Sequence, residues 1–369
     1  LSKKLIEQGN HQLYPIQEKA IPLVLKRKDV LGIAPTGSGK TLAFVLPIIQ
    51  MLGDKEVKKS RAPEALILAP TRELVQQIVE VFKEYGTAAK FPLKPMGVHG
   101  GVSINPQMKA LFGVRVLVAT PGRLLELLEL KALELSKVEM LVLDEADKML
   151  NLGFRDEMNR IMGLLPATRQ NLLFSATLSE EVLEVQSKWL NQPEVIKIMV
   201  SQPQEEQLNQ TGYFVSEEKK GPLLRHLIQS REMKQVLVFT SSVNKADKVV
   251  GKLIKNGIAA AAIHSKKSQG ARSEVLSSFK SGKTPVLVTT DLLARGIDIA
   301  FLPFVINYEL PRSPKDFIHR VGRTGRAENP GEAIVFVTPA DKHHFKVIQK
   351  KMGRRIEMID AENMDFKVG

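Results

Sequence analysis

Short runs of apolar residues recur along the chain, and most of them end in glycine, serine, threonine or proline. Unbroken apolar runs of this length are typical of strands that are buried on both faces of a parallel sheet. In the first half the runs are DVLGIAPT, EALILAP, RVLVATPG, EMLVLDEAD and QNLLFSAT, which occupy 29–36, 64–70, 115–122, 139–147 and 170–177. In the second half they are QVLVFTSS, IAAAAIHS, TPVLVTTD, FVINYEL and EAIVFVT, which occupy 235–242, 258–265, 284–291, 304–310 and 332–338.

Between these runs lie stretches whose apolar residues follow a helical period, such as RELVQQIVEVFKEYG at 72–86. A regular alternation of strand and helix predicts a mainly parallel sheet flanked by helices, which is an α/β fold. The segment SQPQEEQLNQ at 201–210 is polar, contains a proline and has almost no apolar periodicity. We therefore expect a first domain over 1–200, a linker over 201–210 and a second domain over 211–369.

Composition and charge narrow the class of protein. Of the 369 residues 43% are hydrophobic and 25% are charged, with no apolar tract of eighteen residues, so we expect a soluble protein without a membrane span. The absence of cysteine excludes disulfides and thiolate zinc sites, and LSKKLIEQGN has no apolar signal core, so we expect a cytoplasmic or nuclear protein. A net charge of +13 favours a polyanionic partner, although a basic surface that only confers solubility would explain it equally well.

A phosphate-binding loop is predicted at APTGSGKT, residues 34–41, between an apolar run and a helical stretch. Its second half keeps the pattern G-x-x-x-x-G-K-[ST], whereas Ala34 replaces the first glycine. Glycines let backbone N–H groups turn towards phosphates, and the following helix adds its positive dipole end. We expect Lys40 to reach the β and γ phosphates and Thr41 to bind Mg²⁺. The second half of the chain has no such pattern.

Two carboxylates of the sequence DEAD, 144–147, follow the apolar run MLVL. A carboxylate at the carboxyl end of a strand lies beside the phosphate loop in sheets of this kind, so Asp144 is the expected second Mg²⁺ ligand. Glu145 is then positioned to orient or deprotonate an attacking water.

Eight motifs along the chain resemble those of the DEAD-box RNA helicases, in the same order and spacing from about Gly9 to Gly331. They are APTGSGKT (34–41), PTREL (70–74), GG (100–101), TPGR (120–123), DEAD (144–147), SAT (175–177), TTDLLARGID (289–298) and HRVGRTGR (319–326). The resemblance implies two tandem RecA-like domains that close together on ATP and RNA. It makes the expected activity an RNA-dependent ATPase and RNA helicase.

The resemblance also implies the residues that bind and hydrolyse ATP. Gln17 would read the adenine edge, with Tyr14 at the position where the family usually has threonine. The phosphates would be held by Pro35, Thr36, Gly37, Ser38, Gly39, Lys40 and Thr41. Because HRVGRTGR lies in the half without a phosphate loop, its arginines can reach the γ-phosphate only if the domains meet. By resemblance Arg323 and Arg326 are arginine fingers, and Asp298 contacts the ribose or the water across the cleft.

Further motif residues would couple ATP to RNA or contact the RNA backbone. Ser175 and Thr177 would link nucleotide state to domain closure, and His319 and Arg320 would tie the domain interface. The expected RNA contacts are Thr71, Arg72, Gly100, Gly101, Thr120 and Arg123 in the first domain and Ser241, Gln269, Arg272, Thr289 and Thr290 in the second. Small and hydroxylated residues of this kind grip phosphates without reading bases. Aromatic residues make up only 5%, which argues against a base-stacking platform.

The leading hypothesis is therefore an ATP-dependent RNA helicase that locally separates short duplexes or remodels RNA–protein complexes. An ATP-gated RNA clamp with slow turnover would use the same motifs, and the lifetime of its closed complex would distinguish it. A translocating DNA helicase is a third hypothesis, which a comparison of ATP hydrolysis with RNA and with DNA would test.

Overall fold

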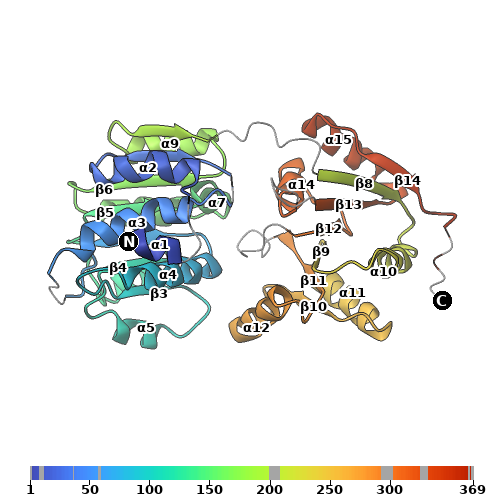
Figure 1. Cartoon of the computed structure of the whole chain (residues 1–369), viewed down its shortest axis with the longest axis horizontal. Coiled ribbons are helices and arrows are strands. Elements are labelled where there is room, and N and C mark those ends of the chain that lie inside the picture. The colour runs from blue at the N-terminus through green and yellow to red at the C-terminus, as the bar shows by residue number, and fades with distance from the viewer. Residues whose placement is uncertain are drawn as a thin grey trace. The chain divides into compact units, whose positions relative to one another are not determined.

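The chain folds into two compact units, Leu1–Val200 and Ser201–Gly369. The structure is a computed structural model that describes residues 2–7, 12–35, 37–56, 60–198, 208–291, 302–324, 331–364 and 366. Each unit contains a seven-stranded sheet flanked by helices (Figure 1). All strand pairs within the sheets of the described residues are parallel.

The first unit alternates strands and helices along most of its length. Its elements are α1 (Ser2–Glu7), α2 (Pro15–Leu25), β1 (Val30–Ile33), α3 (Lys40–Gly53), β2 (Ala65–Leu68), α4 (Arg72–Gly86), β3 (Pro95–Val98), α5 (Ile104–Ala110), β4 (Val116–Ala119), α6 (Pro121–Glu129), β5 (Met140–Leu143), α7 (Ala146–Asn151), α8 (Arg155–Gly163), β6 (Gln170–Ser175), α9 (Glu180–Trp189) and β7 (Glu194–Lys197).

The order of strands in this sheet is β3-β4-β2-β5-β6-β1-β7. Strand β6 lies between β5 and β1, with Leu143 opposite Leu173 and Ile33 opposite Ser175. The residues that follow these three strands therefore leave the sheet at one edge. Such an edge, outside the carboxyl ends of parallel strands, is where α/β sheets bind ligands.

Successive side chains of a strand pack on opposite faces of the sheet, so the first unit has two cores. Val30 of β1 packs with the apolar side chains of α2, α3 and α4, whereas Leu31 packs with those of α6 to α9. The same division holds along β2 and β4. Covering both faces with helices explains why the central strands are apolar without alternation.

The second unit repeats this architecture. Its elements are β8 (Leu208–Phe214), α10 (Lys220–Ser230), β9 (Val236–Phe239), α11 (Val243–Lys255), β10 (Ala260–Ile263), α12 (Gln269–Lys280), β11 (Val286–Thr289), β12 (Phe304–Asn307), α14 (Pro314–Val321), β13 (Gly331–Val337), the 3₁₀ turn η1 (Pro339–Asp341), α15 (Lys342–Met352) and β14 (Glu357–Asp360). The strand order is β10-β11-β9-β12-β13-β8-β14. One face packs against α10 and α11, and the other packs against α12, α14 and α15.

Side-chain hydroxyls begin several of the helices. An N-cap hydroxyl accepts a hydrogen bond from the backbone N–H three residues later at Thr71, Ser179, Ser242, Ser268 and Ser313. Each such bond satisfies one of the N–H groups that a helix start leaves without an intrahelical partner. These caps fix where α4, α9, α11, α12 and α14 begin.

The predicted α/β fold class is confirmed, and all ten apolar runs contain a strand. The linker prediction needs a correction, because residues 208–210 are part of β8. Pairing with β13 holds residues 208–210 in the sheet, and β14 pairs with the rest of β8, from Thr211 to Phe214. Residues 201–207 of the expected linker lie outside the described residues.

Within the described part of the chain, every helix is too short or too polar to span a membrane.

Candidate nucleotide site and nucleic-acid interface

The phosphate loop connects β1 to α3 at the edge of the first sheet formed by the carboxyl ends of β1, β5 and β6. Gly37 and Gly39 have φ angles of 79° and 83°, in the left-handed region that glycine adopts at little cost. A Cβ atom at Gly39 would also collide with the side-chain amide of Gln17. The loop therefore requires glycine at this position both for its backbone shape and for space. Thr36 lies outside the described residues.

Lys40 begins α3, and its ammonium group lies inside the loop. Nζ donates hydrogen bonds to the carbonyl oxygens of Ala34, at 2.6 Å, and of Pro35, at 2.9 Å. The side chain is only 8% exposed. Burial lowers the pKa of Lys40, and the nearby carboxylates of Asp144 and Glu145 oppose that shift. A cation held in this way can exchange its two carbonyl partners for phosphate oxygens.

Gln17 connects the N-terminal segment to the phosphate loop. Its side-chain oxygen accepts from the Tyr14 backbone N–H at 3.0 Å, and its Nε2 donates to the Gly39 carbonyl oxygen at 3.0 Å. Gln17 is buried, whereas Tyr14 is half-exposed beside the loop. The amide thus already serves a structural role, and the adenine contact expected of Gln17 stays a prediction.

Asp144 and Glu145 follow β5 at the same edge. Asp144 is 2% exposed, and burial together with the charge of Glu145 raises its pKa to about 7, while Lys40 acts in the opposite direction. Glu145 has a φ of 52°, which is uncommon for a residue other than glycine and costs backbone strain. Its carboxylate pairs with Lys148 Nζ at 2.5 Å. Lys148, which follows DEAD directly, is a partner that the motif did not reveal.

Ser175 and Thr177 link the ends of β5 and β6. Thr177 Oγ1 donates to Asp147 Oδ2 at 2.8 Å, and Ser175 Oγ donates to the Thr177 carbonyl oxygen at 2.8 Å. The SAT and DEAD segments are therefore joined by a direct side-chain hydrogen bond. A displacement of one segment would disturb the other.

The expected RNA contacts of the first unit are of two kinds: threonines at helix starts and arginines that contact the protein itself. Thr71 caps α4 and Thr120 precedes α6. Arg123 is buried, where it donates to the Val102 carbonyl oxygen at 2.9 Å and pairs with Glu126. The guanidinium of Arg72 lies against Gly101. Both arginines thus contact the segment that contains Gly100 and Gly101, and their own contact with RNA stays a prediction.

The expected RNA contacts of the second unit are also only partly exposed. Ser241 is exposed, and both its N–H, at 2.7 Å, and its hydroxyl, at 2.8 Å, donate to the carboxylate of Glu309. Thr289 is fully buried, with Oγ1 directed at the Ile263 carbonyl oxygen, so its side chain does not reach solvent. Arg272 is buried on α12, and Thr290 is half-buried at the end of β11. The side chain of Gln269 lies outside the described set.

Arg320 on α14 is buried inside the second unit, with 2% of its surface exposed. Its guanidinium makes bidentate hydrogen bonds to Asp291 and further bonds to Asn307 Oδ1, at 3.0 Å, and to the Glu309 carbonyl oxygen, at 2.6 Å. It also lies 4.8 Å from the centre of the Phe239 ring. All of these partners lie in the second unit, and the expected role of Arg320 at the domain interface stays a prediction.

The remaining residues of the second unit are described incompletely. Arg323 is buried in the turn after α14, whereas an arginine finger has to be exposed when it acts. Arg326, Asp298 and the side chain of His319 lie outside the described residues. The finger assignments therefore stay predictions.

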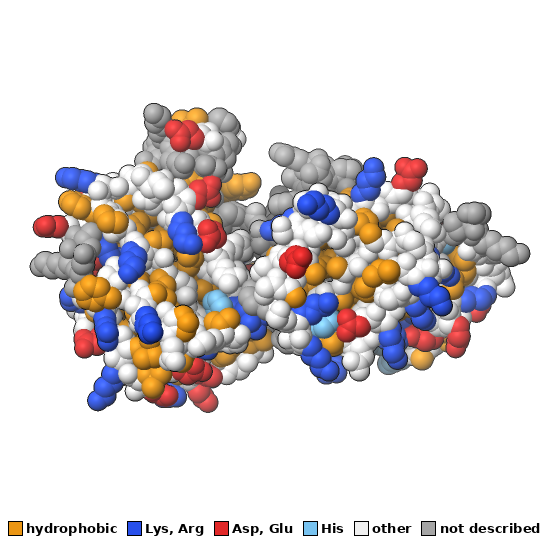
Figure 2. Space-filling model, turned by 90° about the horizontal axis from the view of Figure 1, so that it is seen from below, with side chains coloured by type: hydrophobic (Ala, Val, Ile, Leu, Met, Phe, Trp, Pro, Cys, Tyr) orange, Lys and Arg blue, Asp and Glu red, His pale blue; other side chains and the backbone are white. Residues whose placement is uncertain are grey.

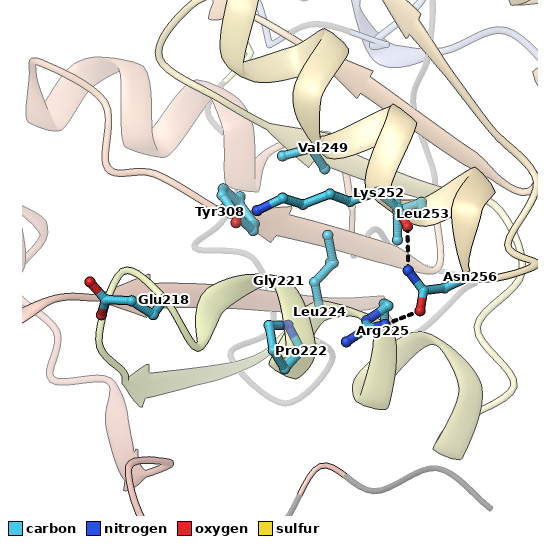
Figure 3. A pocket seen from close by; sticks show the side chains of 10 residues that line it. All are labelled: Glu218, Gly221, Pro222, Leu224, Arg225, Val249, Lys252, Leu253, Asn256 and Tyr308. Atoms are coloured by element: carbon cyan, nitrogen blue, oxygen red, sulfur yellow. Dashed lines mark hydrogen bonds between the residues drawn. The ribbon is translucent and has the colours of Figure 1, made fainter.

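A cavity of about 280 Å³ in the second unit contains none of the predicted site residues. It lies between α10 and α11, with Leu224, Leu253 and Tyr308 among its lining and Arg225 at its edge (Figure 3). On the face shown in Figure 2, Lys and Arg side chains are scattered over each unit among acidic ones. The Lys and Arg side chains therefore form no single basic patch on that face.

Two family models match the chain. The model for the DEAD/DEAH box helicase matches residues 14–185, and the model for the helicase conserved C-terminal domain matches residues 218–328. The ATP-dependent RNA helicase CshA of Listeria monocytogenes is 38% identical over 98% of this chain and 69% of its own length. The DEAD-box ATP-dependent RNA helicase CshA of Geobacillus kaustophilus is 37% identical over 98% of this chain and 77% of its own length.

Solved structures agree with these relatives. Dbp5 of S. cerevisiae bound to RNA and ADP BeF3 has a TM-score of 0.84 and 30% sequence identity, over 98% of this chain and 93% of that chain. A DEAD box protein from Methanococcus jannaschii has a TM-score of 0.56 and 34% identity, over 97% of this chain and 95% of that chain. With the phosphate loop and the acidic pair at one sheet edge, these similarities lead to one conclusion: the chain belongs to the DEAD-box ATP-dependent RNA helicases.

Proposed function

We propose that the chain uses ATP to bind RNA along its backbone across two domains, and that closure of the domains separates short duplexes or remodels RNA–protein complexes. The observation that carries this proposal is the arrangement at the edge of the first sheet. The phosphate loop with Lys40, the acidic pair and the hydrogen bond from Thr177 to Asp147 all lie at the ends of β1, β5 and β6. A change in nucleotide there has a direct route to the SAT segment.

Mg²⁺ is proposed as the companion of ATP. Asp144 is a buried carboxylate whose pKa is raised to about 7, and a divalent cation would stabilise its ionised form. The described residues contain no cluster of three or more metal-binding side chains. This fits Mg²⁺, which proteins usually hold through one or two carboxylates together with phosphates and water. Asp144 and Thr41 would supply the protein ligands.

Each residue at this edge then has a chemical role. Lys40 would exchange the carbonyl oxygens of Ala34 and Pro35 for the β and γ phosphates. Glu145 would orient the attacking water and accept its proton. In the second domain, Arg323 and Arg326 would stabilise charge on the transferred phosphoryl group, with Asp298 beside the ribose or the water. Their position in the other half of the chain would make hydrolysis depend on domain closure.

RNA would be held through its phosphates and 2′-hydroxyls. In the first domain, the backbone of Gly100 and Gly101 and the helix starts at Thr71 and Thr120 are the proposed contacts. In the second domain, Ser241 is the proposed contact with the clearest exposure. Gln269, Arg272 and Thr290 remain proposed contacts by motif. A cytoplasmic location is part of this proposal and rests on composition alone.

Replacement of Lys40 tests the proposed function. We expect Lys40→Ala to lower RNA-stimulated ATP hydrolysis by about 10²-fold or more, because the cation that meets the phosphates is lost. Separation of a short RNA duplex should be lost with it. Lys26→Ala, which changes an exposed lysine that precedes β1, is the control and should keep both activities. Near-normal hydrolysis by Lys40→Ala would contradict the proposal, as would equal stimulation of the unmodified chain by RNA and by DNA.

A further inference from the structure

The loop after β3, residues 99–103, has a backbone shape that depends on glycine. Gly101 has a φ of 78°, and a Cβ atom there would lie 2.7 Å from Arg72 Nη1. A Cβ atom at Gly100 would meet nothing within 4 Å, so that side of the loop is open. We call residues 99–103 the glycine loop.

Gln107 on α5 holds the start and the end of the glycine loop together. Its Oε1 accepts from the His99 N–H at 3.0 Å, and its Nε2 donates to the carbonyl oxygens of His99, at 3.3 Å, and Ser103, at 3.2 Å. The side chain is 9% exposed. One buried amide therefore satisfies three backbone groups, which only a side chain with both a donor and an acceptor can do.

The two arginines of neighbouring motifs support the middle of the same loop. Arg123 donates to the Val102 carbonyl oxygen at 2.9 Å, and the Arg72 guanidinium occupies the space that a Cβ atom of residue 101 would need. Gln107 thus holds both ends of the glycine loop, and the two arginines hold its middle. All of these contacts come from the body of the first unit.

The open side of the glycine loop consists of backbone. In the described part of the chain, the N–H groups of Gly100 and Gly101 have no acceptor within hydrogen-bond distance. Glycine backbone that is held in one conformation can approach a phosphate closely, because no side chain intervenes. A loop that had to be ordered during binding would bind more weakly, since the ordering costs conformational entropy.

We propose that Gln107 is a positioning residue for RNA binding: it holds the glycine loop in the conformation in which the N–H groups of Gly100 and Gly101 meet an RNA phosphate. This inference rests on the proposed contact of these glycines with RNA. It also assigns Arg72 and Arg123 to the support of the loop, so the contact with the phosphate is made by uncharged backbone groups.

Gln107→Met tests the inference, because methionine has a similar length and removes all three hydrogen bonds. With a nonhydrolysable ATP analogue and a uniform single-stranded RNA of about ten nucleotides, we expect RNA binding to weaken about tenfold. The affinity for the ATP analogue alone should stay unchanged. The dependence of RNA affinity on salt should also keep its slope, because no cation leaves the interface. Asn105→Leu, which alters an exposed amide on the same helix, is the matched control.

A double-mutant cycle with Gly101→Ala separates positioning from a general loss of stability. If Gln107 acts through the glycine loop, Gln107→Met should weaken RNA binding much less once Gly101→Ala has already distorted that loop. Should Gln107→Met fail to fold, Gln107→Asn, whose amide is too short to span both ends, replaces it and should weaken RNA binding as well.

Each possible failure has a distinct meaning. Wild-type RNA affinity in a folded Gln107 variant would overturn the inference, as would a flatter salt dependence or full additivity with Gly101→Ala. Absence of nucleotide-dependent RNA binding by the unmodified chain would instead overturn the proposed function itself.

Discussion

Lys40 and Asp144 are both buried near the same edge of the first sheet, and burial disfavours the charged form of each. Burial lowers the pKa of Lys40 and, together with Glu145, raises that of Asp144 to about 7. A phosphate beside the lysine and a divalent cation beside the carboxylate would each stabilise the charged form. Such a site would suit an anion and a cation that arrive together, as the proposed complex of Mg²⁺ with ATP would.

Replacing Glu145 should separate binding from hydrolysis. In Glu145→Gln the neighbouring Asp144 would still hold the proposed Mg²⁺, whereas the amide can no longer accept a proton from water. We expect the rate of ATP hydrolysis, measured in a single turnover, to fall by roughly 10²–10⁴. Binding of ATP should persist and RNA should be retained for longer. Glu84→Gln, at an exposed position of α4, is the control; rapid release of RNA by Glu145→Gln would argue against the assigned role.

The motifs predicted which residues gather at the nucleotide site, but they did not predict which side chains are exposed to solvent. The letters of the phosphate loop and of DEAD were enough to expect Lys40, Asp144 and Glu145 at one sheet edge. The same kind of reasoning assigned Thr289 and Arg320 to contacts outside their domain, although both side chains are buried within it. A motif fixes which side chain is present, whereas its partners, such as Asp291 for Arg320, depend on how distant segments pack.

At the scale of elements, most strands inside the sheets were predictable, whereas β10 was the only one of the four edge strands that was. A strand with helices on both faces must be apolar throughout, and β1, β2, β4, β5 and β6 carry that signal. The strands β3, β7 and β14 lie at sheet edges, where fewer positions are buried, and their sequences lack an apolar run. The first three residues of strand β8 end the polar segment SQPQEEQLNQ, which predicts a linker, and only the pairing partners of β8 reveal the strand.

The Arg320 cluster should stabilise α14 against β12 and the end of β11. Arg320→Met removes a buried cation and leaves Asp291 without its bidentate partner. Because Asp291 is partly exposed, we expect a loss of about 2–4 kcal/mol in the unfolding free energy of the second unit, below the full cost for a buried pair. Trp189, the only tryptophan, lies in α9 and reports on the first unit.

Urea unfolding followed by two signals measures this effect. The tryptophan fluorescence transition should stay in place, while circular dichroism should show part of the chain unfolding at lower urea. Arg355→Met changes an exposed arginine of the same unit and is the control. An Arg320→Met variant as stable as this control would show that the cluster adds nothing to stability.

At the scale of the whole molecule, the proposed catalytic groups are divided between two units that each have their own core. The first unit has Lys40, Asp144 and Glu145, and the second would supply Arg323, Arg326 and Asp298. With the catalytic groups divided in this way, ATP hydrolysis can change RNA binding only if ATP and RNA both favour the same closed arrangement. The link between ATP and RNA is then a coupling free energy, and thermodynamics requires it to be equal in both directions.

Reciprocal binding measurements test this coupling. We expect a nonhydrolysable ATP analogue to tighten RNA binding by a factor that corresponds to roughly 1–3 kcal/mol, and RNA to tighten binding of the analogue by the same factor. Cleavage of the chain within 201–207, after a protease site is inserted there, should reduce that factor, because the second unit is no longer at a high effective concentration near the first. The same insertion left uncut is the control. If ATP and RNA bind the intact chain independently, closure is not the switch, and the arginine fingers proposed at 323 and 326 would lose their role.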